Sequence, residues 1–128
     1  LQMIDIIRSE STPEDRMVQY GTLYQIPYQA QRLPAYRFIT PAIELMTPDF
    51  TLYEDWMTEI RDGLTTHRPK FILIGGKAIT RTEAGDIAPA EANAPVLTTL
   101  LAYLGAGENG YSIRMEGDFG ILFERAAE

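Results

Sequence analysis

Apolar residues recur at helical spacing in three segments of the chain, residues 1–8, 52–64 and 95–104. In each segment the apolar positions fall three or four residues apart, which is the pattern of a helix that buries one face. Thr51 and Glu54 have the spacing of a capping box, in which each side chain accepts a hydrogen bond from the backbone of the other residue. We therefore expect the second helix to begin at this pair.

Short apolar runs between these segments predict strands. The runs are bounded by glycine, proline or other turn-forming residues and comprise residues 16–20, 36–39, 70–74, 111–115 and 119–124. The run at 70–74 is apolar at four consecutive positions, which is typical of a central parallel strand covered on both faces. The last two runs flank a turn at 116–118 and predict a hairpin.

The remaining segments are a short helix over residues 22–31, interrupted by Pro27, and a long surface loop over residues 76–93. Helices then stand between most of the strands, an order that favours a parallel sheet with right-handed crossovers. We therefore expect one α/β domain over residues 1–128. Its predicted fold is a Rossmann-like three-layer sandwich with a mainly parallel sheet and a C-terminal antiparallel hairpin.

The composition excludes several classes of function but adds little to the prediction of the fold. The 128 residues carry a net charge of −7, which opposes binding to nucleic acid because phosphate demands a basic surface. The absence of cysteine excludes disulfides, thiol nucleophiles and thiolate metal sites. No apolar run approaches the roughly 20 residues of a membrane span. The chain starts at Leu1 instead of methionine, so we expect it to be a piece of a larger protein.

Glycines at the predicted strand ends are the first candidate for a ligand site. Gly21 follows one strand, and Gly75, Gly76 and Lys77 follow the buried strand. Ligands bind at the carboxyl ends of strands in open parallel sheets, where glycines let backbone amides approach a phosphate. The segment lacks the phosphate-loop pattern because Ala78 stands where that pattern requires a hydroxyl. Glycines that only let the chain turn are the alternative.

A second candidate is a cluster of aromatic and basic residues, Tyr20, Tyr24, Tyr28, Arg32, Tyr36 and Arg37. Tyrosine and arginine together suit contacts to sugar or phosphate, a protein interface, or ordinary packing. The single histidine, His67, is expected at the turn from helix to strand and away from the carboxyl ends, which favours a structural role. No residue pattern indicates catalytic residues, a metal site or a cofactor.

Two stretches of the chain resemble a known family. In the first, the matching residues are Tyr28, Arg32, Pro34, Arg37 and Phe38, with Ala35-Tyr36 where a small residue and serine are commoner. In the second, the matching residues are Arg68, Pro69, Lys70, Phe71 and Ile72. With the order of segments, these stretches resemble the soluble C-terminal region of bacterial polytopic membrane glycosyltransferases. The group is the dolichyl-phosphate-mannose mannosyltransferase-like and aminoarabinose-transferase-like one.

The resemblance implies a domain on the extracytoplasmic face of the bacterial inner membrane, tethered by membrane spans that precede it. Family members use polyprenyl-phosphate sugars as donors, and their catalytic acids lie upstream of this region. The implied role is therefore non-catalytic positioning of acceptor or donor. The implied partners are the membrane-embedded part of the same polypeptide and a lipid-linked sugar or acceptor glycan.

Two other functions stay open beside this one. A free-standing domain that binds a small ligand or nucleotide would use the strand-end glycines, and a protein-interaction domain would use the tyrosine and arginine cluster. The residues predicted to contact a ligand are Gly21, Tyr24, Tyr28, Arg32, Arg37, Gly75, Gly76 and Lys77.

Overall fold

The computed structural model describes residues 2–21, 25–35, 48–91 and 94–126, without the side chains of residues 25 and 28. The α-helices are α1 (Gln2–Ser9), α2 (Gln25–Ala30), α3 (Tyr53–His67) and α4 (Pro95–Gly105). The strands are β1 (Met17–Tyr20), β2 (Phe71–Gly75), β3 (Ile79–Arg81), β4 (Ile87–Pro89), β5 (Tyr111–Gly117) and β6 (Gly120–Arg125). Two 3₁₀ turns, η2 (Gly76–Ala78) and η3 (Gly107–Asn109), complete the described elements. The helices predicted over 1–8, 22–31, 52–64 and 95–104 are confirmed within a few residues.

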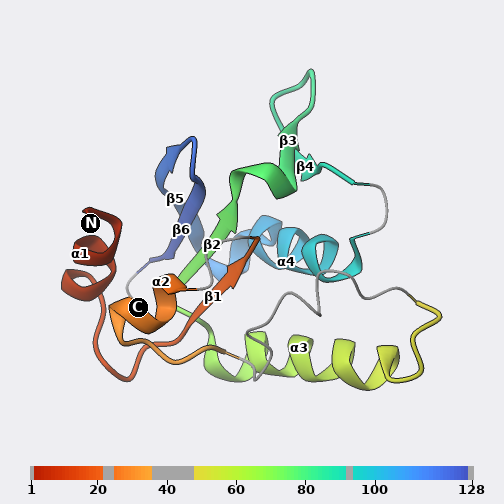
Figure 1. Cartoon of the computed structure of the whole chain (residues 1–128), viewed down its shortest axis with the longest axis horizontal. Helices are drawn as coiled ribbons and strands as arrows, with labels where there is room; N and C mark the ends of the chain where they lie inside the picture. The colour runs from red at the N-terminus through yellow and green to blue at the C-terminus, as the bar shows by residue number, and fades with distance from the viewer. Residues whose placement is uncertain (1, 22–24, 36–47, 92–93, 127–128) are drawn as a thin grey trace.

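The main sheet has the strand order β1-β2-β6-β5 (Figure 1). β1 and β2 are parallel, with Met17 opposite Phe71, whereas β2 pairs antiparallel with β6 and β6 antiparallel with β5. The protein is therefore a mixed α/β fold with a mainly antiparallel sheet. The prediction of a Rossmann-like, mainly parallel three-layer sandwich is wrong.

The error comes from where the C-terminal hairpin enters the sheet. β2, α4 and β5 run as a β-α-β crossover, but β6 lies between the two strands and pairs with both. The sequence of β6 explains this position, because Ile121, Leu122 and Phe123 are buried side by side and so occupy both faces of the strand. In β5, Ser112, Arg114 and other polar residues occupy every second position, a pattern that suits the outer edge of a sheet.

A β-bulge at Arg114 adjusts the edge strand to the core. Ile113 pairs with Phe123 and Met115 pairs with Leu122, so Arg114 is an extra residue without a partner in the register. The extra residue moves Met115 to the face of the sheet opposite that of Ile113. Met115 then packs with α1 and α2, and the Arg114 side chain reaches the segment after α1.

The core lies on both faces of β2, whose five residues are all buried. Ile72 and Ile74 pack with α3 and α4, whereas Phe71 and Leu73 pack with α1 and α2. Burying each of these side chains contributes roughly 1.5–3 kcal/mol. The expectation that this run is covered on both faces is confirmed, although β2 is parallel to only one of its neighbours.

The ends of α3 differ from the prediction. The helix begins after Leu52, and no side chain caps its first turn, so the predicted capping box of Thr51 and Glu54 is absent. It runs to His67 and ends where Arg68 adopts a left-handed conformation with φ 41°. The Arg68 amide bonds back to Leu64, which closes the last turn.

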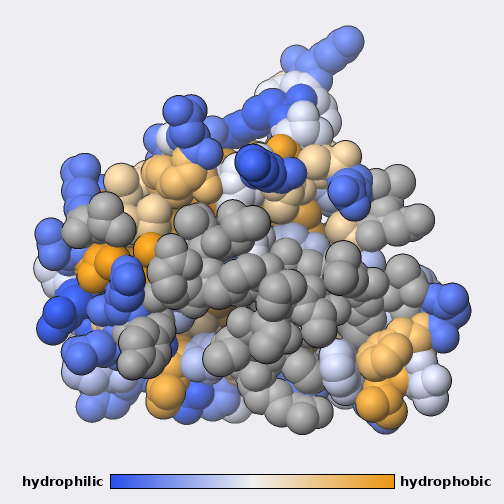
Figure 2. Space-filling view, in the orientation of Figure 1, coloured by the Kyte–Doolittle hydropathy of each residue, from blue (hydrophilic) through white to orange (hydrophobic). Residues whose placement is uncertain are grey.

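The segment predicted as a long surface loop over 76–93 contains the β3–β4 hairpin, which projects from the molecule and has a hydrophilic tip (Figures 1 and 2). Its strands have only three residues each, so the sequence is too short there to show an apolar alternation that would indicate them. The tip is held by the Thr82 and Asp86 backbones and by the Thr82 hydroxyl, which accepts from the Asp86 amide at 3.1 Å.

The strand predicted at 36–39 lies outside the described residues. Among the helices that are described, none combines the length and the apolar character that crossing a membrane requires.

Candidate functional site

The strand-end glycines predicted as a ligand site lie together, but their close packing has a structural reason. Gly21 and Gly75 are buried neighbours at the ends of β1 and β2, and a Cβ on Gly21 would lie 3.0 Å from the Gly75 Cα. The Gly76 amide donates to the Phe119 carbonyl at 2.9 Å. A Cβ on Gly76 would lie 2.8 Å from the Asp118 carbonyl oxygen. The glycine amide that was expected to face a phosphate is therefore bonded to β-turn backbone.

Lys77 is exposed in η2 beside these glycines. A shallow cleft of about 180 Å³ opens next to it, between the base of the β3–β4 hairpin and the β5–β6 turn. Arg81 and Glu116 face each other at its rim, with one guanidinium nitrogen 2.8 and 2.9 Å from the two carboxylate oxygens. Ligand binding by Gly21, Gly75, Gly76 and Lys77 stays a prediction.

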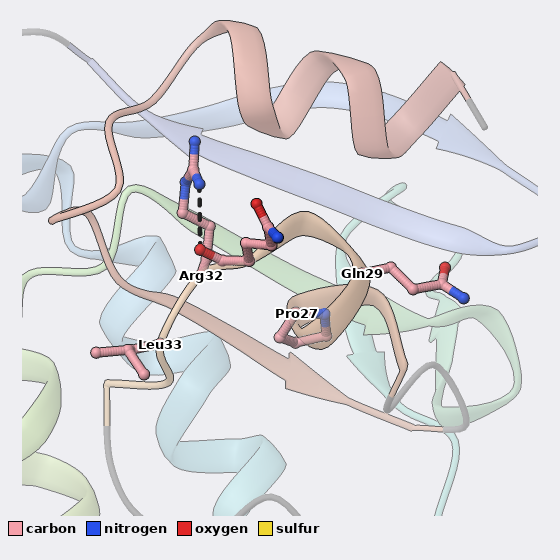
Figure 3. Close-up of a pocket in the computed structure, with 5 residues that line it drawn as sticks. Pro27, Gln29, Arg32 and Leu33 are labelled. Carbon is pink, nitrogen blue, oxygen red and sulfur yellow. Dashed lines mark hydrogen bonds between the residues drawn. The ribbon is translucent and has the colours of Figure 1, made fainter.

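Arg32 is the described arginine of the predicted tyrosine and arginine cluster, and it is buried inside the fold with 9% of its surface exposed. It follows α2 and points toward α1 (Figure 3). Its Nε donates to the Ser11 hydroxyl at 2.9 Å, and its terminal nitrogens donate to the carbonyls of Ala30, Gln31, Arg8 and Ser11. The cation thus satisfies carbonyls at the C-terminal ends of two helices, where the helix dipole favours positive charge.

The structure describes only part of the rest of that cluster. Tyr20 is buried on β1 and belongs to the core on the α3 and α4 side. Tyr24, Tyr36, Arg37 and the side chain of Tyr28 lie outside the described residues. An open hollow of about 510 Å³ lies beside Arg32, and its lining includes Pro27, Gln29 and Leu33. Among the described members, Tyr20 therefore adjoins Gly21, whereas Arg32 lies near the opposite end of β1 from the strand-end glycines.

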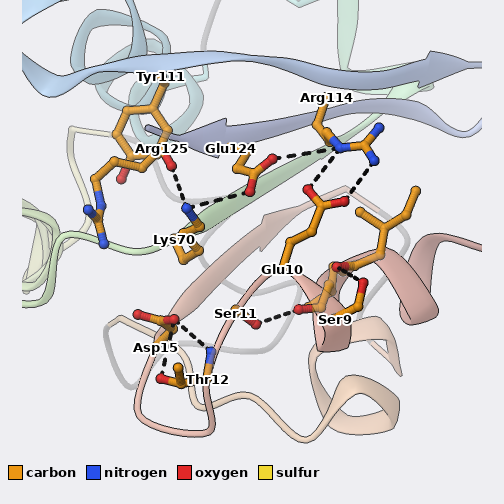
Figure 4. A network of polar contacts seen from close by, with 12 residues as sticks. Ser9, Glu10, Ser11, Thr12, Asp15, Lys70, Tyr111, Arg114, Glu124 and Arg125 are labelled. Carbon is orange, nitrogen blue, oxygen red and sulfur yellow. Dashed lines mark hydrogen bonds and ion pairs between the residues drawn. The ribbon is translucent and has the colours of Figure 1, made fainter. Parts of the chain in front are cut away.

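Four charged residues that the sequence did not predict as a site meet at the opposite end of β2 and β6 (Figure 4). They are Glu10 after α1, Lys70 before β2, Arg114 in β5 and Glu124 in β6, and we call them the charged cluster. Arg114 donates to both oxygens of Glu10, at 2.7 and 2.9 Å. Glu124 lies between the two cations, 3.7 Å from Arg114 and 3.5 Å from Lys70. The cluster thus connects α1 with three segments of the sheet.

The two carboxylates of the charged cluster have opposite pKa shifts. Hydrogen bonds from Arg114 lower the pKa of Glu10 below 4.5. Burial raises the pKa of Glu124 above 4.5, and the neighbouring Glu10 carboxylate adds to the rise. Neighbouring carboxyls with separated pKa values are common in catalytic sites but also in structural ion-pair networks.

The cavity beside the charged cluster measures about 360 Å³ and is open to solvent. Most of its polar groups already bond within the protein. Thr12 donates to Asp15 through both its amide and its hydroxyl, the Ser11 hydroxyl donates to the Ile7 carbonyl, and the Lys70 ammonium donates to the Arg125 carbonyl at 2.7 Å. The arrangement is that of a self-satisfied polar network that fastens α1 and the following turn to the sheet.

A tyrosine pair stands on the other face of the same end. The Tyr111 hydroxyl donates to the Pro69 carbonyl and lies 3.3 Å from the Tyr103 hydroxyl. Tyr103 in turn bonds the Leu64 carbonyl at 3.2 Å. Burial raises the pKa of Tyr111 well above 10, so this hydroxyl is a neutral donor at physiological pH.

His67 is exposed at the last position of α3, at the helix-to-strand turn where it was expected. Within the residues that the structure describes, no three acidic or histidine side chains are placed to hold a metal ion.

The charged cluster could not be predicted from a local sequence pattern, because Glu10 and Arg114 are 104 positions apart. A partial signal was available in the predicted hairpin, where Arg114 and Glu124 fall on facing strands with opposite charges. Comparison with protein-family models, with curated proteins and with solved structures finds no match to this chain.

Proposed function

We propose that this chain is a non-catalytic domain of a membrane glycosyltransferase that uses polyprenyl-phosphate sugar donors, and that it helps to position the acceptor or the donor. The proposal keeps the expected setting on the extracytoplasmic face of the bacterial inner membrane. It rests on the resemblance of two stretches to that family, and on how the described residues of those stretches are used.

The observation that carries the proposal is that both stretches meet at the start of β1. On one side, Met17 donates to the Leu33 carbonyl at 3.0 Å and pairs with Pro34. On the other side, Met17 pairs with Phe71. Segments that are more than 30 positions apart thus flank the same residue from opposite edges, as expected for two parts of one folding motif.

Contacts of Arg16 with both stretches reinforce this meeting point. The Arg16 guanidinium donates to the Pro34 carbonyl at 3.0 Å, and the Lys70 amide donates to the Arg16 carbonyl at 2.8 Å. The Arg32 guanidinium donates its hydrogen bonds to carbonyls at helix ends. The residues that match the family thus use their polar groups for hydrogen bonds within the fold, which supports a scaffold role. A scaffold role agrees with catalysis located elsewhere in the polypeptide.

The first test is where the protein occurs and how large it is. An antibody raised against residues 1–128 is applied to fractionated cells that carry the gene. We expect an antigen much larger than 128 residues that pellets with membranes and is released by detergent but not by salt. An antigen of 128 residues in the soluble fraction contradicts the proposal, as does a coding sequence without apolar stretches of about 20 residues upstream of Leu1.

The second test concerns the positioning role and uses the full-length transferase in membranes. Lys77→Ala and Arg37→Ala remove two of the predicted ligand contacts, and Arg61→Ala on the exposed face of α3 is the matched control. Positioning predicts a higher KM for one substrate with kcat little changed in the first two variants, and no change in the control. A kcat near background with an unchanged KM would assign chemistry to these residues and contradict the proposal.

A further inference from the structure

An exposed apolar patch surrounds the start of α3. Phe50 and Leu52 keep 39% and 44% of their surface exposed, and they are two of the four large apolar side chains that are exposed in the described part of the chain. The Phe50 ring packs edge-to-face on Trp56, with the ring centroids 5.0 Å apart. Figure 2 shows apolar surface gathered at this end of α3. We call Phe50, Leu52 and Trp56 the α3 patch.

The fold holds the α3 patch in a fixed shape. The Trp56 amide donates to the Leu52 carbonyl at 2.9 Å, and the Tyr53 amide donates to the Phe50 carbonyl at 3.0 Å. Trp56 packs against the core with its inner side. Apolar side chains that are fixed and still face water are typical of interaction surfaces. A surface that is already ordered also loses little conformational entropy when a partner binds.

Acidic side chains line one side of the α3 patch. Asp55, Glu59 and Asp62 follow the spacing i, i+4 and i+7, so they form one row along α3. Asp55 comes three residues after Leu52, which places the row beside the patch. The helix carries four carboxylates and a single arginine. These charges outweigh the roughly half positive charge at the N-terminal end of a helix dipole.

The acidic row decides which occupant suits the α3 patch. A second copy of the chain would bring the same carboxylates face to face, and an anionic lipid surface would bring phosphates to them. Both contacts are repulsive. A protein segment with apolar and basic side chains complements both features. Because the row follows helical spacing, a helix with lysine or arginine at the same spacing matches it along its length.

We propose that the α3 patch is the docking surface for a basic amphipathic helix of a partner protein. The apolar face of that helix would lie on Phe50 and Leu52, and its basic side chains would pair with Asp55 and Asp62, both of which are exposed. This inference does not depend on the proposed function.

The test uses Trp56 as a built-in reporter, because it is the single tryptophan of the chain. The probe is a helical peptide of leucine and lysine without aromatic residues, titrated into the 128-residue chain while the emission of Trp56 is recorded. We expect a saturable shift in emission with a micromolar Kd. Salt at about 0.5 M should weaken binding about tenfold, because it screens exposed charges. A peptide with glutamate in place of lysine should not bind.

Two pairs of variants locate the binding. Leu52→Ser removes an apolar contact, and serine suits the position before a helix, so we expect a folded chain that binds about tenfold more weakly. Leu33→Ser replaces another exposed leucine and is the matched control. Asp55→Asn should weaken binding about two- to threefold. Asp5→Asn on the exposed side of α1 removes the same charge elsewhere, and neither control should change the Kd.

Four results would overturn the proposal. One is no saturable emission shift up to about 1 mM peptide. Another is equal weakening by the patch variants and their controls, because binding would then follow the net charge alone. The third is an emission shift on phosphatidylglycerol and phosphatidylcholine vesicles that Leu52→Ser abolishes and Asp55→Asn leaves unchanged, which assigns the patch to lipid. The fourth is self-association in sedimentation that Leu52→Ser abolishes, which assigns it to a second copy.

Discussion

The two ends of the β2–β6 pair are built on different principles. At one end Gly75 pairs with Gly120, and the backbones of the neighbouring turns approach so closely that no side chain fits. At the other end Phe71 pairs with Glu124, and long charged side chains from β5, from the residue after α1 and from the residue before β2 complete the contacts. The glycine end therefore depends on excluding every extra atom, whereas the charged end depends on ion pairs that water weakens one by one.

The largest expected effect tests the glycine end. In Gly120→Ala the new Cβ would lie 1.9 Å from the Ile74 carbonyl oxygen, at a backbone φ of +133°. Both the overlap and the backbone conformation oppose the substitution. We expect the free energy of unfolding in urea to fall by more than about 4 kcal/mol, or folding to fail.

Two glycines serve as controls for this variant. Gly105→Ala at the end of α4 meets nothing within 4 Å, and we expect it to stay within about 1 kcal/mol of the wild type. Gly85→Ala also enters open space but at φ +88°, so it isolates the backbone strain of roughly 1–2 kcal/mol. If Gly120→Ala unfolds no more easily than Gly85→Ala, close packing does not define the glycine end.

The second expected effect separates buried from exposed charge near the charged end. Arg32→Met removes a buried cation and leaves the Arg8 and Ser11 carbonyls without their donor. We expect a loss of about 3 kcal/mol in the free energy of unfolding. Arg61→Met on the exposed face of α3 is the control and should change stability by less than about 0.5 kcal/mol. Equal stability of the two variants would show that the helix-end carbonyls do not need Arg32.

The third expected effect concerns Tyr111. Tyr111→Phe keeps the ring but removes the hydroxyl that bonds the Pro69 carbonyl, and a net loss of about 1 kcal/mol is expected at neutral pH. Because its pKa is raised in the folded protein, Tyr111 stabilises the fold below the ordinary value of 10.0, and this stability is lost as pH rises above it. Alkaline unfolding should therefore be less steep in Tyr111→Phe, and an identical alkaline profile would contradict the assignment.

Local patterns were sufficient for most elements of this fold. Apolar spacing predicted α1, α3 and α4, and the continuous run at 70–74 predicted a strand covered on both faces. The pairing of strands was not predictable in the same way, because helices between strands favour a parallel sheet but do not exclude a hairpin inserted between its strands. The apolar residues on both faces of β6, Ile121 to Phe123, were the available signal for an interior strand.

For the candidate sites too, local features were predictable from the sequence, whereas contacts between distant segments were not. Gly21 and Gly75 were predicted at one end of the sheet and lie together there, since strand ends are visible in the sequence. Arg32 was selected for its residue type, but its burial depends on α1 packing over α2. The pair of Glu10 and Arg114 joins the first and last parts of the chain and depends on a bulge, which no local pattern indicates.

The smallest expected effect distinguishes the two carboxylates of the charged end by their pH dependence. Glu10 has a lowered pKa, so it stabilises the fold above 4.5 and this stability is lost as pH falls through the folded pKa. Glu124 has a raised pKa, so its contribution is present below 4.5 and is lost as pH rises through the folded pKa. The two groups thus respond to acid with opposite signs, although they share Arg114.

Replacing each carboxylate by its neutral isostere separates these contributions. Glu10→Gln should be less stable than the wild type near about pH 7, and the difference should shrink as the pH falls from there through the folded pKa of Glu10. Glu124→Gln should equal or exceed the wild type near about pH 7, because it removes a carboxylate whose ionisation burial disfavours. Free energies of unfolding measured across this range give the comparison. If Glu124→Gln loses as much stability as Glu10→Gln at neutral pH, then Lys70 and Arg114 bind the Glu124 carboxylate as tightly as Arg114 binds that of Glu10, and burial does not set the two carboxylates of the charged end apart.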